Sequence, residues 1–373
     1  MSTCIDIIYC YRNRDVQRVK NSLDSLMLQS SDSFKVIFID YGSDDAIASE
    51  IKTLCGKYSF CTYIFIDSQG KMWNRADALN YGFYFSTSDH VFTSDVDMLF
   101  DKDFVKTISS SAEANTAKFY AVGYLSEANT KSCNVNDLSK LKYTKSEDFA
   151  LGMVLLPKSI VVKINGYNSF YAIWGQEDND MKYRIESAGF STKFVDDNVY
   201  MFHQYHPISN ADESSIPVGW LQFIKDYFDN YKIDKPEFGG LNSVRFPLER
   251  PAKHAFFNEV TFTKLDYRKL FIRHHLINSV FNISSGDHVA YIFDVDKNTM
   301  KSSLVYNLGH MLNKFFRLIN IPLEVKSKYK EQYIDGTEIK NEIYFILKSL
   351  ELYIVDYYIK ISDSNIKLVI VKK

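Results

Sequence analysis

Apolar runs alternate with helix-like segments along the first 95 residues of the chain. The runs at 4–9, 34–40, 63–66 and 90–93 have the length and residue types of buried strands. Between them, residues 15–28 and 75–85 carry apolar positions at helical spacing. This alternation predicts a parallel α/β sheet. Ligands bind such sheets beyond the carboxyl ends of the strands, where Arg12, Asp40 and Asp97 fall.

The pattern changes after residue 210. Proline and glycine interrupt short helical signals, so we expect residues 211–287 to form a helical and loop connector. The rest of the chain predicts a small α+β domain over residues 288–373, in which we identify no chemistry. Its expected strands are 289–293, 353–361 and 365–371, and its expected helices are 300–319 and 339–350. The first domain is then expected to span residues 1–210.

Composition narrows the function classes. Hydrophobic residues make up 46% of the chain, enough for sizeable cores. The net charge of −2, with lysines scattered among acids, argues against nucleic-acid binding. The N-terminus does not resemble a signal peptide, and no run approaches the roughly 18 apolar residues of a membrane span. The five cysteines have neither disulfide nor zinc spacing, so we expect a cytoplasmic protein.

Two carboxylates stand one residue apart where the fourth predicted strand ends. Strand side chains alternate between faces, so Asp95 and Asp97 are expected on the same side, where they could grip a divalent cation and a diphosphate. Acidic pairs at strand ends are also common solvated turn residues. The pair alone leaves both interpretations open.

Basic and acidic residues follow the other predicted strands. Arg12 and Arg14 come after the first strand, where their guanidinium groups suit a diphosphate, a uracil edge or a surface salt bridge. Asp40 ends the second strand and could accept from a base N–H or a ribose hydroxyl. Arg75, in the first turn of a predicted helix, opposes the helix dipole, which indicates an anionic partner such as a phosphate, Asp77 or another carboxylate.

Two later segments add candidate chemistry. In residues 174–180, Trp174 offers an apolar face to a pyranose ring, and Asp178 at a helix start could act as general base toward a sugar hydroxyl. Acids in a first turn can equally serve the helix dipole alone. His203 and His206 could converge with Asp97 on one metal ion, or could stabilise a turn before proline.

In order along the chain, these segments resemble the β-1,4-galactosyltransferase family. The family pattern runs Phe-Arg-Asn-Arg, Asn-Arg-Ala…Leu-Asn-x-Gly-Phe, Phe-Ser-Asp-Val-Asp, Ile-Asn-Gly-Phe and Trp-Gly-Gly-Glu-Asp-Asp-Asp. The matching segments are residues 11–14, 74–83, 93–97, 164–167 and 174–180. The resemblance implies a GT-A fold with a Rossmann-like mixed sheet, an inverting mechanism and a UDP-sugar donor. It also implies Mn²⁺, with Mg²⁺ as the alternative.

The resemblance also implies a role for each matching residue. Asp178 corresponds to the catalytic base, and the metal would be held by Asp97, His203 and His206, with His203 in place of the methionine of a Met-x-x-His motif. The implied donor-binding residues are Arg12, Arg14, Asp40, Arg75, Asp95 and Phe149. The implied acceptor-binding residues are Trp174, Gly175, Glu177 and Asn179.

Departures from the family pattern concern the two sugars. Asn179 replaces an acid that helps to hold the acceptor sugar, so the acceptor stays open. Phe149 aligns with the position that governs donor choice, where its ring would crowd an N-acetyl group and favour galactose.

The sequence therefore predicts transfer of a hexose, galactose first, from a UDP-sugar to a glycan or lipid-linked glycan in bacterial surface polysaccharide synthesis. We expect the protein in the cytoplasm, with peripheral contact at the inner face of the plasma membrane. The alternatives are a UDP-N-acetylgalactosamine or UDP-glucose transferase, and a non-catalytic sugar-binding module.

Overall fold

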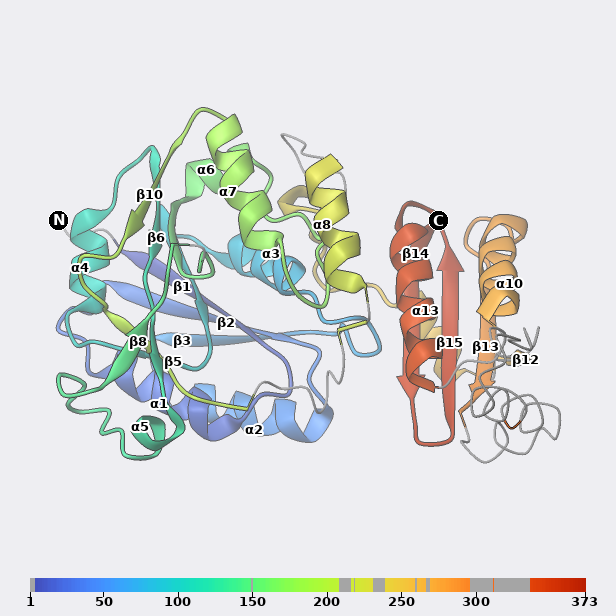
Figure 1. The fold of residues 1–373 in the computed structure, drawn as a ribbon, viewed down its shortest axis with the longest axis horizontal. Helices are drawn as coiled ribbons and strands as arrows, with labels where there is room; N and C mark the ends of the chain where they lie inside the picture. Colours follow the sequence, from blue (N-terminus) through green and yellow to red (C-terminus); the bar gives the residue numbers. More distant parts are fainter. Residues whose placement is uncertain are drawn as a thin grey trace, which may run out of the picture. The chain divides into compact units, whose positions relative to one another are not determined.

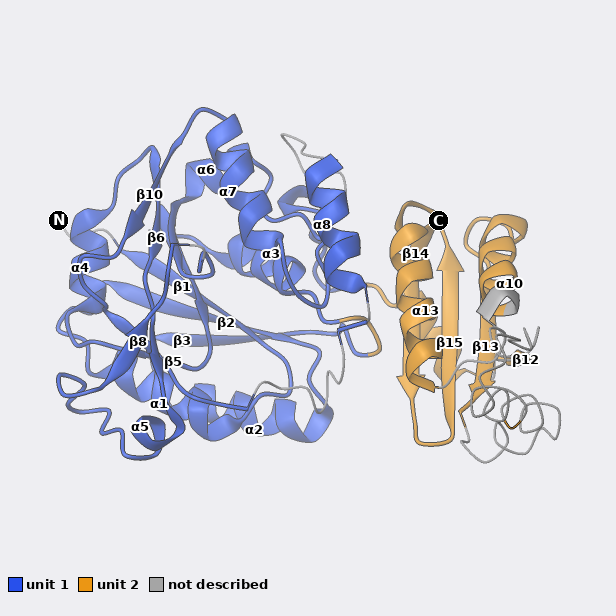
Figure 2. Ribbon diagram, viewed as in Figure 1, with its two compact units in different colours: residues 1–69, 73–248 blue, residues 70–72, 249–373 orange. Residues whose placement is uncertain are grey.

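A computed structural model describes residues 4–148, 150–207, 216–217, 219–230, 239–258, 260–265, 269–295, 311 and 336–373. The chain divides into two compact units (Figure 2). The first contains Met1–Gln69 and Trp73–Leu248, and the second contains Gly70–Met72 and Glu249–Lys373. No helix within these described ranges is long and apolar enough to cross a membrane.

A seven-stranded sheet forms the centre of the first unit, in the order β10-β6-β9-β4-β1-β2-β3 (Figure 1). Its strands are β1 (Ile5–Tyr11), β2 (Phe34–Tyr41), β3 (Cys61–Ile66), β4 (His90–Asp95), β6 (Thr116–Tyr120), β9 (Val154–Pro157) and β10 (Ser191–Val195). The first four strands run parallel, and β9 is antiparallel to both β4 and β6. The predicted α/β class is confirmed, and β9 makes the sheet mixed.

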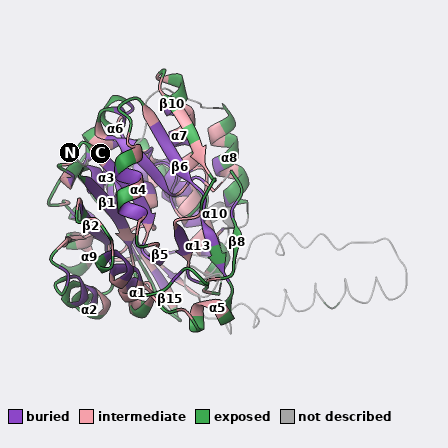
Figure 3. Ribbon diagram, turned by 90° about the vertical axis from the view of Figure 1, so that its left-hand side faces the viewer, coloured by how far each residue is buried: buried purple, intermediate pink, exposed green. Residues whose placement is uncertain are grey.

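Helices cover both faces of this sheet, which is why its central strands are apolar on both sides (Figure 3). Ile7 and Tyr9 of β1 pack with α1, α2 and α4, whereas Ile8 packs with α3, α6 and α7. Gly82 lets α3 approach closely, because a Cβ there would lie 2.2 Å from Cγ2 of Ile8. The helices are α1 (Val16–Met27), α2 (Asp45–Cys55), α3 (Arg75–Phe85), α4 (Phe104–Ser111), α6 (Lys158–Lys163) and α7 (Glu177–Ser187).

A small second sheet follows the carboxyl end of β4. Only the turn at residues 96–97 separates β4 from β5, so this sheet begins where the predicted site lies. In the order β5-β11-β7-β8, β11 is antiparallel to β5 and places His203 opposite Met98. Its strands are β5 (Met98–Phe100), β7 (Gly123–Leu125), β8 (Tyr143–Lys145) and β11 (Met201–His203), and α5 (Glu127–Lys131) follows β7.

The predicted connector over 211–287 is divided between the two units, and the boundary lies at 248/249 instead of 210 or 287. Helix α8 (Trp220–Asn230) belongs to the first unit, where Trp220 and Ile224 are buried. Trp220 donates to the carbonyl of Ala172 at 3.1 Å, and the ring of Tyr227 stacks on Phe170 with centroids 3.7 Å apart. The short helix η1 (Leu241–Ser243) completes this unit.

The second unit is built on a four-stranded sheet in the order β12-β13-β15-β14. The strands predicted at 289–293, 353–361 and 365–371 and the helix predicted at 339–350 all occur, while the helix predicted at 300–319 lies outside the described residues except for 311. The strands are β12 (Thr263–Leu265), β13 (His288–Asp294), β14 (Ile354–Ile361) and β15 (Asn365–Lys372). The helices are α9 (Pro251–Phe257), α10 (Lys269–Asn282), α13 (Gly336–Ser349) and the short η2 (Glu351–Tyr353).

Three residues between β3 and α3 also belong to the second unit. The carbonyl of Gly70 accepts from Ile359 N–H at 2.9 Å, and Met72 N–H donates to the hydroxyl of Tyr357 at 3.1 Å. Gly70 has a φ of +75°, and a Cβ there would lie 2.5 Å from the ring of Tyr358. This contact requires glycine, both for its backbone angle and for the missing side chain.

Candidate functional site

The polar segments predicted to meet at one edge of the sheet do meet there. In the parallel register, Tyr11 lies opposite Asp40 and Cys10 lies opposite Asp95, so β1, β2 and β4 end together. The loop after each strand therefore opens at the same edge, the usual ligand edge of an open α/β sheet.

Asp95 and Asp97 are close in sequence but contact different groups. Strand β4 ends at Asp95 and Asp97 lies in the following turn, so the strand alternation expected for the pair does not apply. Asp95 pairs with Arg75, whereas Asp97 is largely buried beside Arg18 and the two histidines. The pair thus links two neighbouring clusters.

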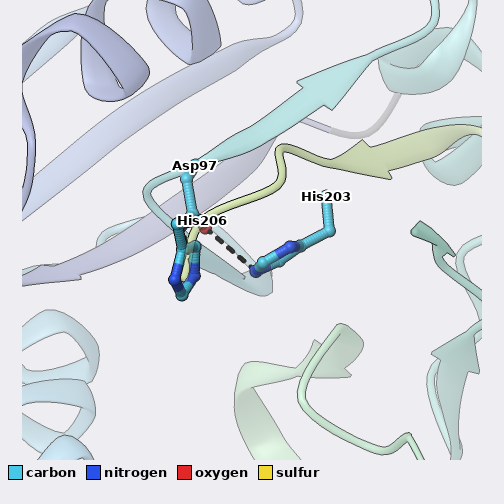
Figure 4. Close-up of side chains that lie close together, drawn as sticks. All are labelled: Asp97, His203 and His206. Carbon is cyan, nitrogen blue, oxygen red and sulfur yellow. Dashed lines mark ion pairs between the residues drawn. The ribbon is translucent and has the colours of Figure 1, made fainter. Parts of the chain in front are cut away.

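The first cluster is a candidate metal centre formed by Asp97, His203 and His206 (Figure 4). Their ligand atoms all lie within 4.8 Å of one another. Nε2 of His203 is 3.6 Å from Oδ1 of Asp97, and Nε2 of His206 is 3.4 Å from Oδ2. Nδ1 of His206 is 2.9 Å from the carbonyl oxygen of Pro207. Because a carbonyl oxygen only accepts, Nδ1 carries the proton, and in the neutral ring the lone pair of Nε2 can bind a metal. Imidazole and carboxylate ligands in this arrangement suit a first-row divalent metal.

Gln204, which the sequence analysis did not single out, ties the histidine loop to Asp97. Its buried amide donates to the carbonyls of Arg18 and Asp97 at 3.0 and 3.1 Å, and it accepts from Asn21 at 2.8 Å. Its backbone N–H also donates to the carbonyl of Asp97. The available signal was the position of Gln204 between the histidines, but its partners lie far away in sequence.

The second cluster centres on Arg75, whose predicted anionic partners are carboxylates. Its Nη1 is 3.1 Å from Oδ1 of Asp178 and 3.9 Å from Glu177, and its Nε is 3.4 Å from Asp95. Nη2 donates to the carbonyl of Gly152 at 2.9 Å. Burial raises the pKa of Glu177 to about 7; the charge of Asp178 adds to this rise and Arg75 opposes it.

Helix α7 places the acids of residues 177–180 in different surroundings. Gly175 and Gln176 have φ angles of +99° and +70°, so the chain turns sharply into the helix and leaves Trp174 60% exposed. Asn179 is exposed and donates to Gln176 at 3.2 Å. Asp180 is buried against Arg184, with 2.8 Å between Oδ2 and Nε, and therefore has a structural role.

The residues predicted to bind the donor differ in their burial and in their hydrogen-bond partners. Arg12 is half-buried, donates to the carbonyls of Tyr41 and Ser68 and lies over the rings of Tyr41 and Trp73. Arg14 is half-buried in the loop after β1. Phe149 lies outside the described residues.

Asp40 is placed differently from the sequence prediction. Its side chain has no exposed surface, and it accepts from Ser43 N–H at 2.9 Å and from Tyr63 O–H at 2.8 Å. Burial raises its pKa. The predicted direct contact with base or ribose does not fit this burial, so we assign Asp40 to bracing the turn after β2.

Two family models match the part of the chain that contains the candidate site. Residues 6–155 match the family model described as "Glycosyl transferase family 2", and residues 131–207 match the model described as "N-terminal domain of galactosyltransferase". A search of curated proteins with this sequence finds no match. Among 323 matching chains of solved structures is the mannosyltransferase PcManGT from Pyrobaculum calidifontis in complex with GDP-Man and Mn²⁺.

The likeness to the mannosyltransferase is remote, at 14% identity and a TM-score of 0.41. It covers 56% of this chain and 59% of that chain. The two family models carry the assignment, because they run without a gap from the first strand to the residue after His206. These matches support a glycosyltransferase of the GT-A fold with similarity to galactosyltransferases.

Proposed function

We propose that the chain is a metal-dependent, inverting hexosyltransferase that moves galactose from a UDP-sugar to a hydroxyl of a glycan acceptor. One observation carries this proposal: Arg75 bridges Asp95 and Asp178, so a candidate base lies next to the turn that holds a candidate metal ligand, Asp97. A transferase needs a base at the acceptor and positive charge at the leaving diphosphate, and this arrangement provides for both.

Asp97, His203 and His206 would hold the metal. Two imidazole ligands favour Mn²⁺ over Mg²⁺, which prefers oxygen ligands. When bound, the ion supplies the positive charge that stabilises the diphosphate leaving group. Arg14, Arg75 and Asp95 would hold the rest of the donor, and Arg12 would position the loops around it.

Asp178 would act as the general base. The acceptor oxygen forms a bond to C1 of the donor sugar, the bond from C1 to the diphosphate oxygen breaks, and the acceptor proton passes to Asp178. Attack opposite to the leaving group inverts the configuration at C1. The exposed ring of Trp174 would give the acceptor sugar an apolar surface, and Glu177 and Asn179 would supply polar contacts from the first turn of α7.

For the acceptor and the cellular location, we keep the expectation from the sequence. We propose a glycan or lipid-linked glycan as acceptor, in the synthesis of a bacterial surface polysaccharide at the inner face of the plasma membrane.

The test is UDP release from UDP-galactose, UDP-N-acetylgalactosamine and UDP-glucose, with Mn²⁺, with Mg²⁺ or with chelator, in the presence of β-linked hexose and N-acetylhexosamine acceptors. We expect Mn²⁺-dependent release from UDP-galactose that Asp178→Asn and Asp97→Asn abolish. Asp196→Asn removes a carboxylate from an exposed pair with Lys145 and is the matched control, with activity unchanged.

Each other outcome has a defined meaning. Release from another donor would refute the galactose assignment and retain the transferase. Release in chelator would refute the metal dependence. UDP binding without release from any donor would favour the non-catalytic sugar-binding module.

A further inference from the structure

A buried tyrosine, Tyr167, contacts the candidate base Asp178. Tyr167 follows α6 in the segment Ile164-Asn165-Gly166-Tyr167, where the family pattern has phenylalanine. Its side chain has no exposed surface, and its hydroxyl is 3.2 Å from Oδ1 of Asp178. Phenylalanine lacks this hydroxyl, so the hydroxyl next to the proposed base is the difference between this chain and the family pattern at position 167.

The ring of Tyr167 is held firmly. It stacks on Phe83 with ring centroids 5.9 Å apart and an interplanar angle of 11°. The side-chain amide of Asn80 donates to the carbonyl of Tyr167 at 2.9 Å and accepts from its N–H at 2.8 Å. Gly166, with a φ of +66°, allows this approach, because a Cβ there would lie 2.3 Å from Oδ1 of Asn80. The hydroxyl thus has a fixed position.

Tyr167 and Arg75 donate to the same oxygen of Asp178. Nη1 of Arg75 is 3.1 Å from Oδ1, the atom that also accepts from Tyr167. Among the described residues, no hydrogen bond of the protein is directed at Oδ2. Gly152 lies on that side, since a Cβ there would lie 3.6 Å from Oδ2. Two donors on one carboxylate oxygen fix the rotation of the group and leave the other oxygen to accept a proton.

We propose that Tyr167 is a positioning residue, which clamps Oδ1 of Asp178 together with Arg75 and so presents Oδ2 to the acceptor hydroxyl. This proposal rests on the proposed function, in which Asp178 is the base. Burial and the nearby Asp178 charge raise the pKa of Tyr167 well above its ordinary value, so the phenol remains a donor. The other charged groups that face Asp178 are Arg75 from α3 and Glu177 from α7, with Asp95 beyond Arg75.

The test is Tyr167→Phe, which removes only the hydroxyl and installs the residue of the family pattern. We expect kcat to fall about tenfold, the size of effect of one hydrogen bond to a charged group, with KM for the donor unchanged. The acid limb of the pH profile of kcat/KM should move to higher pH, because a carboxylate that has lost a donor takes up a proton more readily.

Tyr171→Phe is the matched control. Tyr171 is also buried, and its hydroxyl is 3.4 Å from Oδ1 of Asp180, which lies in the same helical turn as Asp178. This variant loses a comparable bond to a carboxylate that has no part in the reaction, and its pH profile should remain that of the wild type. Normalisation removes an inactive fraction that does not change with pH, so the two profiles are compared over the pH range in which both variants stay folded.

The two proposals fail in different ways. If Asp178→Asn retains transfer, the assignment of the base is wrong and the proposed function must change. If Asp178→Asn is inactive while Tyr167→Phe matches Tyr171→Phe in kcat and pH profile, the base stands and the role of Tyr167 is overturned.

Discussion

Replacement of Gln204 by alanine tests whether the fold holds the histidine loop in position for a metal. The side chain makes three hydrogen bonds, two donated to carbonyls and one accepted from Asn21. At about 1 kcal/mol net for each bond, Gln204→Ala should lower the free energy of unfolding by about 3 kcal/mol. Loss of groups that orient ligands typically weakens metal affinity about 10- to 100-fold, so the half-saturating Mn²⁺ concentration should rise by that factor.

Gln29 offers a matched control in the same unit. Its amide also donates twice, to the carbonyls of Ser25 and Asp101 at 3.1 and 2.8 Å, and it accepts from Val105 N–H at 2.9 Å. Gln29→Ala should therefore destabilise the protein to a similar degree and leave the Mn²⁺ dependence unchanged. The assays are urea unfolding and a Mn²⁺ titration of initial rates. Equal half-saturation in both variants would refute the proposed support of the metal ligands by Gln204.

Three further predictions concern helix α7 and its entry. Asp180→Asn should cost about 3 to 5 kcal/mol in urea unfolding, because Arg184 would keep an uncompensated buried charge; a loss below 1 kcal/mol would contradict this. Burial raises the pKa of Glu177 from 4.5 to about 7, so its contribution to stability is complete below pH 4.5 and is lost as the pH rises through 7. Glu177→Gln should remove this pH dependence, so the free energy of unfolding of the variant, measured against that of the wild type, should be higher at pH 8 than at pH 5. If the free energies of unfolding of the two proteins change in parallel with pH, this prediction is wrong. Trp174→Ala should raise KM for the acceptor at least several-fold with the melting temperature unchanged, because the ring is 60% exposed; an unchanged KM would remove Trp174 from the acceptor site.

The sequence predicted what depends on local pattern. The apolar runs located β1, β2 and β4 to within two residues at each end, because strands buried on both faces must be apolar along most of their length. The end of each strand then placed Arg12, Asp95 and Asp97 at one edge of the sheet. The anionic partner expected for Arg75 was found as Asp95 and Asp178.

What the sequence did not predict depends on contacts between distant segments. Asp40 is buried and accepts a hydrogen bond from Tyr63 of a neighbouring strand, and no local pattern distinguishes a turn-bracing carboxylate from one that faces a ligand. Helix α8 belongs to the first unit because Tyr227 stacks on Phe170, a pairing that is invisible in the spacing of either residue. The hydrogen bond from Gln204 to the carbonyl of Asp97 was not predicted either, because the two residues lie far apart in the sequence.

Gly70–Met72 make the two units difficult to separate genetically. The chain enters the second unit for these three residues, returns to the first, and enters the second again at Glu249. A gene that stops after Leu248 would leave Met72 N–H without Tyr357 and Lys71 without the carboxylate of Asp356, 3.2 Å away. Exchange of the C-terminal unit between homologues would likewise need matching changes at residues 70–72, so we expect the two halves to have been inherited together.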